Sequence, residues 1–268
     1  MASRHRRGLP APRPSATALI TGASSGIGDQ FARELSARGH HVTLAARRKE
    51  RLVALAGELG DALPVRCDVA DPQSREEMLR TIAEAGMEVD VLINCAGFGG
   101  GGPVYEYDPD RAVEMLRTNV EAVFALCGAL TPAMAMRRSG AVVIVSSLAG
   151  ILRPPVNFAA YGASKGASLR YAHALHYEMA KVGVSVTALC PGPIDTEFGA
   201  SSGLEKTMSA MPTFAKATPE DCVAAAFAAL ERGSREAIPN AVVRVAAAAA
   251  RRTPAMVASR VLPAFFRV

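Results

Sequence analysis

A tyrosine and a lysine stand four residues apart, Tyr161 and Lys165, within a stretch of helical periodicity. At that spacing both side chains lie on one face of a helix and can reach each other or a common ligand. A free tyrosine, with a pKa of about 10, is a poor acid–base catalyst at neutral pH, and a neighbouring ammonium group favours its phenolate. The pair therefore indicates a tuned acid–base group, although an exposed helix that merely carries both residues would show the same spacing.

A glycine-rich turn is the second segment with a chemical signature. An apolar run at 16–20 is typical of a buried strand, residues 27–37 have helical periodicity, and three glycines with two serines lie between them. Such a turn lets backbone N–H groups approach a ligand, and the helix that follows presents the positive end of its dipole. We therefore predict a pyrophosphate site, with tight helix-on-sheet packing as the alternative reason for the glycines. Its residues are Gly22, Ser24, Ser25, Gly26, Ile27 and Gly28.

Two arginines follow that turn at a spacing typical of dinucleotide sites. Arg47 and Arg48 lie roughly twenty residues after the glycines, where such sites carry an acid for the ribose 2′-hydroxyl or an arginine for a 2′-phosphate. Because a guanidinium pairs with phosphate oxygens and a carboxylate would repel them, the sequence predicts NADP(H) rather than NAD(H). The basic start of a solvated helix is the other explanation for these arginines.

The order of elements predicts how these groups are brought together. Apolar strand-like runs alternate with helical stretches along the chain, which indicates a single α/β domain: a doubly wound Rossmann fold with a central parallel sheet flanked by helices on both faces. In such sheets ligands bind outside the carboxyl ends of the strands. The residues that follow the predicted strands are small, polar or charged: Thr21-Gly22, residues 46–48, Asp68-Val69, residues 94–97, Ser146-Ser147 and Pro191-Gly192.

The composition fits one such domain. The chain has 268 residues, of which 50% are hydrophobic and 21% charged, with a formal net charge of +5. Its five cysteines are scattered through apolar runs, which indicates free thiols in a reducing compartment. We see no paired Cys/His spacing and expect no metal, and because the basic residues gather partly at the ends we expect no nucleic-acid partner.

The two ends differ from the body of the chain. Residues 1–14 hold four arginines and three prolines and are predicted to be a disordered basic arm before the domain at 15–240. Residues 241–268 mix arginines with Val, Leu and Phe as an amphipathic extension, which could lie on a membrane surface, cover a neighbouring subunit or pack on its own domain. No stretch is predicted to span a membrane or serve as a signal peptide, so we expect a cytoplasmic protein, with peripheral membrane contact through 241–268 left open.

The sequence resembles the short-chain dehydrogenase/reductase family over residues 16–232. The resemblance rests on the order of TGASSGIG at 21–28, NCAG at 94–97, Asn119, Ser147, YGASK at 161–165 and PGPIDT at 191–196. Within the family the chain is most similar to NADP(H)-using ketoreductases of the 3-oxoacyl and hydroxysteroid type. The resemblance implies a Rossmann fold and an oxidoreductase.

The resemblance also implies roles for individual residues. Tyr161 would give its proton to a substrate carbonyl as hydride arrives at carbon, and Lys165 would also bond the nicotinamide ribose. Ser147 would hold the substrate oxygen, and Asn119 a proton-relay water near Lys165. The implied cofactor-binding residues beyond the glycine turn are Arg47, Arg48, Asp68, Val69, Asn94, Ala96, Gly97, Tyr161, Lys165, Pro191, Gly192, Ile194 and Thr196.

Two departures from the family pattern bear on the site. The segment between Ser147 and Tyr161 is one residue longer than the family usually shows, which leaves Ser146 as the alternative serine. Cys95 stands where the family has an asparagine, and a thiol cannot replace the paired donor and acceptor of an amide, so we expect a structural hydrogen bond to be missing.

The remaining expectations concern substrate and partners. Residues 197–216 lie where the family places a mobile flap, and Met208, Met211 and Phe214 would give it an apolar inner face for a small carbonyl or alcohol substrate. The resemblance implies a homo-oligomer, dimer or tetramer, built on the helices around Asn119 and Tyr161.

The sequence therefore predicts an NADP(H)-dependent oxidoreductase that transfers hydride between nicotinamide and a carbonyl or secondary alcohol of an apolar substrate. A dinucleotide-sensing binding protein without catalysis is the alternative from another class. Association of the arginine-rich ends with nucleic acid or anionic membranes is the third hypothesis.

Overall fold

A computed structural model describes residues 8–152, 157–194 and 216–252. Its centre is a seven-stranded sheet in the order β3-β2-β1-β4-β5-β6-β7, with every neighbouring pair parallel. The strands are β1 (Ala16–Thr21), β2 (His41–Ala46), β3 (Ala62–Arg66), β4 (Glu88–Asn94), β5 (Ala141–Val145), β6 (Ser185–Leu189) and β7 (Glu236–Ala237). The helices are α1 (Gly26–Ala37), α2 (Lys49–Leu59), α3 (Pro72–Glu84), α4 (Pro109–Leu116), α5 (Ala122–Arg137), α6 (Leu148–Ile151), α7 (Ala159–Ala180), α10 (Pro219–Arg232) and α11 (Ala241–Arg252), with a π-helix, η1 (Arg117–Glu121).

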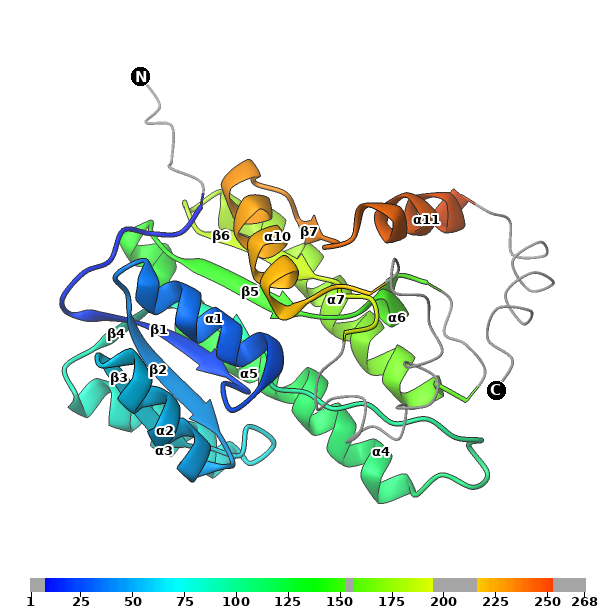
Figure 1. Ribbon diagram of the computed structural model, residues 1–268, viewed down its shortest axis with the longest axis horizontal. Coiled ribbons are helices and arrows are strands. Elements are labelled where there is room, and N and C mark those ends of the chain that lie inside the picture. The colour runs from blue at the N-terminus through cyan, green and yellow to red at the C-terminus, as the bar shows by residue number, and fades with distance from the viewer. Residues whose placement is uncertain (1–7, 153–156, 195–215, 253–268) are drawn as a thin grey trace.

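Two apolar clusters cover the two faces of the sheet, so the predicted doubly wound fold is confirmed (Figure 1). Successive strand residues point to opposite faces: Leu19 packs with α3, α5 and α7, whereas Ile20 packs with α1, α2 and α10. On the second face the rings of Phe31 and Phe227 meet edge to face, which joins α1 to α10. The strand order reverses between β1 and β4, and this is the point where such sheets bind ligands.

Local signals fix where several helices begin. Asp71 accepts a hydrogen bond from the Gln73 N–H at the start of α3, and Thr218 forms a capping box with Asp221 at the start of α10. Both caps are followed by proline, as the sequence predicts. The five cysteines, all among the described residues, form no disulfide, and four of them are buried, with Cys95 half-buried.

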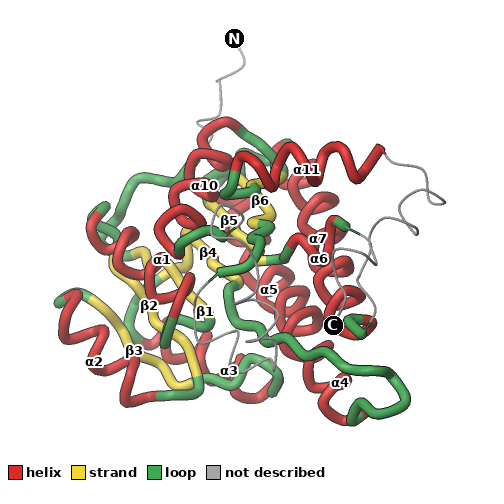
Figure 2. Tube along the Cα trace, turned by 45° about the vertical axis from the view of Figure 1, so that its right-hand side comes forward, coloured by secondary structure: helices red, strands yellow, loops and turns green. Residues whose placement is uncertain are grey.

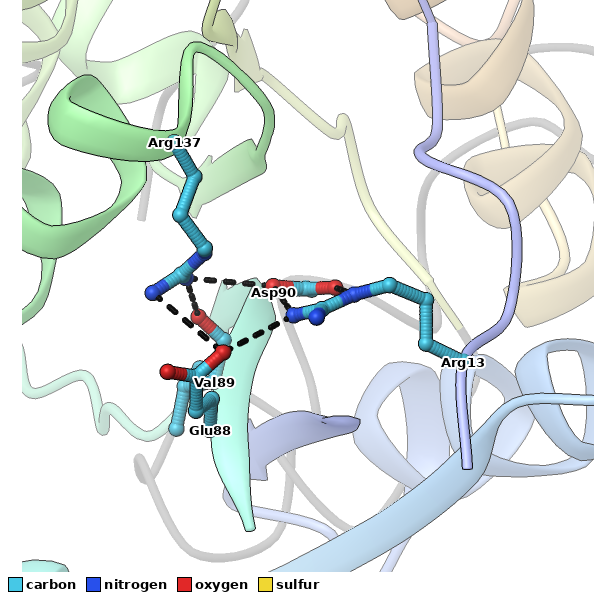
Figure 3. Close-up of polar contacts among 5 residues, drawn as sticks. All are labelled: Arg13, Glu88, Val89, Asp90 and Arg137. Carbon is cyan, nitrogen blue, oxygen red and sulfur yellow. Dashed lines mark hydrogen bonds and ion pairs between the residues drawn. The ribbon is translucent and has the colours of Figure 1, made fainter. Parts of the chain in front are cut away.

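The structure corrects the prediction of a disordered arm for residues 8–14. The Gly8 N–H donates to Ser185 Oγ, and the Arg13 guanidinium makes two 2.8 Å hydrogen bonds to the two carboxylate oxygens of Asp90. Figure 3 shows Arg13 and Arg137 approaching Asp90 from two sides, with Asp90 itself nearly buried. The arm is fixed because a buried carboxylate needs charged partners, a long-range requirement that local composition does not reveal.

A second correction concerns the helical run from Pro109 to Arg137. With 29 residues and a mean hydropathy of 1.4 it is long and apolar enough to cross a membrane by length and composition alone, contrary to the expectation that no stretch reaches that length. Here it packs as a core helix, with Leu126 and Cys127 buried against the sheet. Core helices of soluble proteins pass the same test, so this helix is weak evidence for a membrane span.

Candidate functional site

A cavity of approximately 460 Å³ lies at the carboxyl ends of the strands. It brings together the ends of β1, β2, β3, β4, β5 and β6, as the strand-end rule predicts. Its lining includes Gly22, Ser24, Ser25, Gly26, Ile27, Arg47, Arg48, Asp68, Val69, Ala96, Gly97, Ser147, Tyr161, Lys165, Pro191, Gly192 and Ile194, all predicted from the sequence, together with Arg111, Glu114 and Thr118, which were not. Gly28, Asn94 and Asn119 lie behind this lining, and Thr196 and residues 197–215 of the predicted flap lie outside the described residues.

The glycine turn is shaped by close backbone contacts. Gly22 has a φ of +71°, and a Cβ there would lie 2.9 Å from the Ala96 backbone nitrogen; a Cβ on Gly28 would collide with the Gly22 carbonyl. Both glycines are therefore needed for packing. Gly26 and Ile27, at the N-terminus of α1, still line the cavity, so the turn also fits a pyrophosphate, because first-turn N–H groups and the helix dipole favour an anion.

The two arginines after β2 differ in their contacts. Arg48 donates to the hydroxyls of Ser24 and Ser25, each at 2.9 Å, and so lies on the glycine turn. Arg47 is 65% exposed and lies 3.8 Å from the Glu114 carboxylate. Both line the cavity at its rim, and the arrangement presents two guanidinium groups beside the serines of the turn.

Tyr161 and Lys165 are both buried in the wall of the cavity. Lys165 Nζ donates to the Val145 carbonyl at 2.9 Å and lies 6.0 Å from the centre of the Tyr161 ring. Burial raises the pKa of Tyr161 to about 12, while its hydrogen bond with Ser147 acts in the opposite direction. Burial also lowers the pKa of Lys165 to about 8.

These shifts correct one expectation from the sequence. The ammonium of Lys165 was expected to favour the Tyr161 phenolate, but in this structure desolvation outweighs any such effect and the phenol is held neutral. The neutral phenol has a proton to give, hydrogen-bonded to Ser147 at the cavity wall. A lysine with a pKa of about 8 is close to its titration point near neutral pH.

The question of which serine faces the tyrosine is resolved by their contacts. Ser147 bonds with Tyr161 and lies at the start of α6, where it also accepts from the Ala149 N–H at 3.1 Å. Ser146 instead is buried and donates to the Lys165 carbonyl at 2.8 Å. The longer segment that follows therefore leaves Ser147 in register with Tyr161.

Asn119 lies in the π-helix η1 and holds the loop after β4. Its side-chain oxygen accepts from the Phe98 N–H at 3.1 Å, and its amide nitrogen donates to the Phe98 carbonyl at 2.9 Å and to Ser164 Oγ at 3.0 Å. A Cβ on Gly97 would lie 2.9 Å from the Asn119 oxygen and 3.3 Å from Lys165 Nζ. Asn119 thus connects this loop to the helix that carries Tyr161 and Lys165. A π-helical turn is frequent at functional sites.

The loop after β4, where Cys95 stands in place of the family's asparagine, is fixed by Thr21. Thr21 Oγ1 accepts from the N–H groups of Cys95 and Ala96, each at 3.1 Å, which fixes the backbone beside the glycine turn. Asn94 is buried and donates to Cys127 Sγ at 3.4 Å. The sequence analysis missed this role of Thr21, for which its place directly before Gly22 was the available signal.

A buried arginine that the sequence analysis did not single out supports the wall after β3. Arg75 donates to the Val69 carbonyl at 2.6 Å and to the Glu121 carboxylate at 2.8 Å. It therefore connects the Asp68-Val69 turn to η1, two residues from Asn119. No local sequence pattern indicates this role, because one partner is the backbone carbonyl of Val69 and the other, Glu121, is distant in sequence.

Comparisons with known proteins agree with this geometry. The family profile described as "short chain dehydrogenase" matches residues 16–207. The chain is 34% identical over 207 residues to a short chain dehydrogenase of Pseudocercospora fijiensis, covering 75% of this chain and 66% of that protein. It is 33% identical over 224 residues to the very-long-chain 3-oxoacyl-CoA reductase of Anas platyrhynchos, covering 81% of this chain and 69% of that one.

A similar arrangement occurs among solved structures. The short-chain dehydrogenase from Sphingobium yanoikuyae in complex with NADPH superimposes with a TM-score of 0.77 at 29% identity, over 88% of this chain and 93% of that one.

Proposed function

This chain belongs to the short-chain dehydrogenase family, and from that premise we propose that it is an NADP(H)-dependent oxidoreductase acting on a carbonyl or secondary alcohol of an apolar substrate. The observation that carries the proposal is the cavity wall in which Ser147, Tyr161 and Lys165 lie together, opposite a glycine turn that fits a pyrophosphate. The oxidoreductase class and a nicotinamide dinucleotide cofactor follow from the family and its NADPH-bound neighbour. The preference for NADP(H) and the role of Tyr161 are the proposal's own.

The residues divide the work between binding and proton transfer. The N–H groups at the start of α1 would hold the pyrophosphate, and Arg47 and Arg48 a 2′-phosphate. When bound, the nicotinamide supplies or accepts the hydride. Ser147 and Tyr161 would both hydrogen-bond the substrate oxygen, and the neutral phenol of Tyr161 would donate its proton to that oxygen during reduction. Lys165 would limit the build-up of negative charge on Tyr161 as the proton leaves.

The apolar substrate class rests on the relatives and on the predicted flap. The relative from Anas platyrhynchos is named a 3-oxoacyl-CoA reductase, a protein whose substrate joins a carbonyl to a long apolar chain. We propose the same kind of substrate here, and a homo-oligomer, dimer or tetramer, as the functional form in the cytoplasm. Exposed Leu116 and Phe124, on the helices next to Asn119, support an interface there.

Replacing Tyr161 by Phe tests the chemistry with little change in volume. NADPH consumption would be followed with long-chain 3-oxoacyl-CoA esters and bulky cyclic ketones as probes. We expect turnover to fall by about 10²–10⁴-fold while the affinity for NADPH stays within about twofold, because the hydroxyl is removed and the glycine turn is untouched.

The matched control is Tyr171→Phe, which removes a phenol from the same helix at a residue stacked on Phe124 and outside the cavity lining. It should leave turnover unchanged. If Tyr161→Phe turns over as fast as the control, the proposed mechanism is wrong. Tight NADPH binding without turnover of any probe by the unaltered protein would instead favour a dinucleotide-sensing binding protein.

A further inference from the structure

The C-terminal helix α11 is fixed to the body along one face. It begins at Asn240, whose side-chain oxygen accepts from the N–H groups of Val242 and Val243 at 2.9 and 3.1 Å. Val243 packs against the core cluster, and Ala247, one turn later, is 2% exposed. The helix contacts α6 and lies at the periphery on the side of α6 and α7 (Figure 1, Figure 2).

The other face of α11 combines exposed apolar side chains with positive charge. Val242 and Val245 are 58% and 70% exposed, at the i, i+3 spacing that puts them on one side of the helix. Arg244 is exposed between them in sequence. The helix contains no acidic residue and ends in Arg251 and Arg252.

Positive charge is concentrated at the ends of this chain rather than spread over it. Residues 241–268 contain five arginines and no acidic residue, and residues 1–14 contain four arginines and none. The rest of the chain, residues 15–240, therefore holds 21 of the 30 basic side chains against all 25 acidic ones. The net charge of +5 thus comes from the two ends, and the body by itself is acidic.

We propose that α11 binds the surface of an anionic lipid bilayer through Val242, Val245 and its arginines. A bilayer surface offers anionic headgroups beside an apolar layer, and an amphipathic helix with basic residues matches both. Nucleic acid would attract the arginines but offers little to exposed valines. An acidic protein surface would need a separate apolar patch in register with them.

The position of α11 gives this surface a consequence for the site. α6 directly follows Ser147 and contacts α11, so the helix proposed to bind lipid packs on the helix next to this serine. Delivery of an apolar substrate from the lipid would rest on the proposed function. Binding to the lipid does not, because it needs neither cofactor nor turnover.

Sedimentation with vesicles tests the proposal on the full chain. The probes are vesicles of equal parts phosphatidylcholine and phosphatidylglycerol, and vesicles of phosphatidylcholine alone. We expect the protein to sediment with the first and not the second, and to be released by high salt. Replacing Arg244, Arg251 and Arg252 by Glu should lower the partition coefficient by about 100-fold or more, and Val242→Ser with Val245→Ser by about tenfold.

A matched triple substitution separates a local site from general charge. Arg66, Arg80 and Lys181 are exposed and lie on β3, on α3 and after α7, so replacing them by Glu makes the same change in net charge away from α11. This variant should still sediment. Circular dichroism and NADPH affinity would confirm that each variant is folded. If the protein turned over none of the carbonyl probes, the result of the vesicle experiment would still stand.

Four results would overturn the proposal. One is that the unaltered protein stays in solution with anionic vesicles, and another is that the α11 and control variants lose binding equally. A third is a serine variant that binds vesicles as tightly as the unaltered protein and binds duplex DNA equally well, which would make α11 a general polyanion site. In the last, the unaltered protein has the molar mass of a dimer, the arginine variant has that of a monomer, and neither binds vesicles. This result would assign the surface to a second copy of the chain.

Discussion

Arg48 and Arg47 should contribute unequally to binding the proposed 2′-phosphate. Arg48 lies on Ser24 and Ser25 of the glycine turn, whereas Arg47 is mostly in solvent. A charged hydrogen bond to phosphate contributes about 1.5–3 kcal/mol. We therefore expect Arg48→Ala to weaken NADPH binding by about 10–100-fold and Arg47→Ala by less, with NADH affinity changed little in either, as measured by nicotinamide fluorescence titration.

Lys49→Ala is the control for that titration, since it removes a neighbouring exposed charge that does not line the cavity. Equal loss of NADPH and NADH affinity in Arg48→Ala would mean that this arginine only shapes the turn. Unchanged discrimination in both arginine variants would remove the argument for NADP(H).

Lys165 gives the cofactor-free protein a specific pH dependence. Burial lowers its pKa to about 8, so between about pH 8 and the ordinary lysine pKa of about 10.4 the unfolded chain binds more protons than the folded one. Lys165 should therefore contribute a rise in the free energy of unfolding in that window, by up to about 1.4 kcal/mol per pH unit. Cys95, Cys127 and Cys222 contribute in the opposite direction, because burial raises the pKa of each thiol to about 12. Urea unfolding of the unaltered protein and of Lys165→Met between about pH 7 and about pH 9.5 would isolate the lysine contribution as the difference between the two pH profiles.

This contribution should be lost in Lys165→Met and kept in Lys181→Met, which removes an exposed lysine after the same helix. If both variants follow the unaltered protein, Lys165 is not the buried base that the structure indicates.

At the scale of elements, η1 and α3 are connected by Arg75. Its hydrogen bonds to the Val69 carbonyl and to Glu121 link the turn after β3 to the π-helix of Asn119. Lysine at this position keeps the charge but lacks the fork that reaches both partners. We expect Arg75→Lys to lower the free energy of unfolding by about 2 kcal/mol and to weaken NADPH binding about fivefold, measured by urea unfolding and by titration.

Arg80→Lys, on the exposed side of the same helix, should change stability by less than about 0.5 kcal/mol. A loss of stability in Arg75→Lys with unchanged NADPH affinity would show that the Asp68-Val69 turn keeps its shape without this arginine.

Elements with a strong local signature could be predicted from the sequence, and elements defined by distant partners could not. The strands, the glycine turn and the capped helices α3 and α10 follow from periodicity, glycine and proline. The π-helix η1 has no such signal, because it depends on Asn119 bonding Phe98 and Ser164 across the fold. The two-residue strand β7 exists only as an edge partner of β6.

The same division applies to the candidate site. Tyr161, Lys165 and the glycine turn were predicted from their spacing, and Ser147 from the order of motifs that resembles the family; all of them line the cavity. Arg75 and Glu114 escaped prediction because they reach the site from helices whose sequences are those of any solvated helix. The raised pKa of Tyr161 also escaped prediction, since it follows from burial that only the packed structure reveals.

At the scale of the whole molecule, Arg13 connects the N-terminal segment to the amino end of the sheet. Asp90 on β4 has a side chain only 4% exposed and is shared by Arg13 and by Arg137 of α5, at 2.8 and 3.1 Å. A buried carboxylate that loses one of two charged partners keeps the other, whereas deleting it leaves two guanidinium groups with the half-exposed Glu88 as their common acceptor. The residues before β1 therefore belong to the cooperative fold.

A double-mutant cycle in urea measures this coupling. We expect Arg13→Ala to cost about 1 kcal/mol and Asp90→Ala about 3–5 kcal/mol. The double variant should cost little more than Asp90→Ala alone, because the pair that Arg13 then keeps, with Glu88 at 3.0 Å, is half-exposed and weak. Asp61→Ala, at a carboxylate that is 83% exposed, should cost less than about 0.5 kcal/mol. Additive costs for Arg13 and Asp90 would mean that the two residues stabilise the fold independently, and that residues 8–14 are held by their other contacts rather than by this pair.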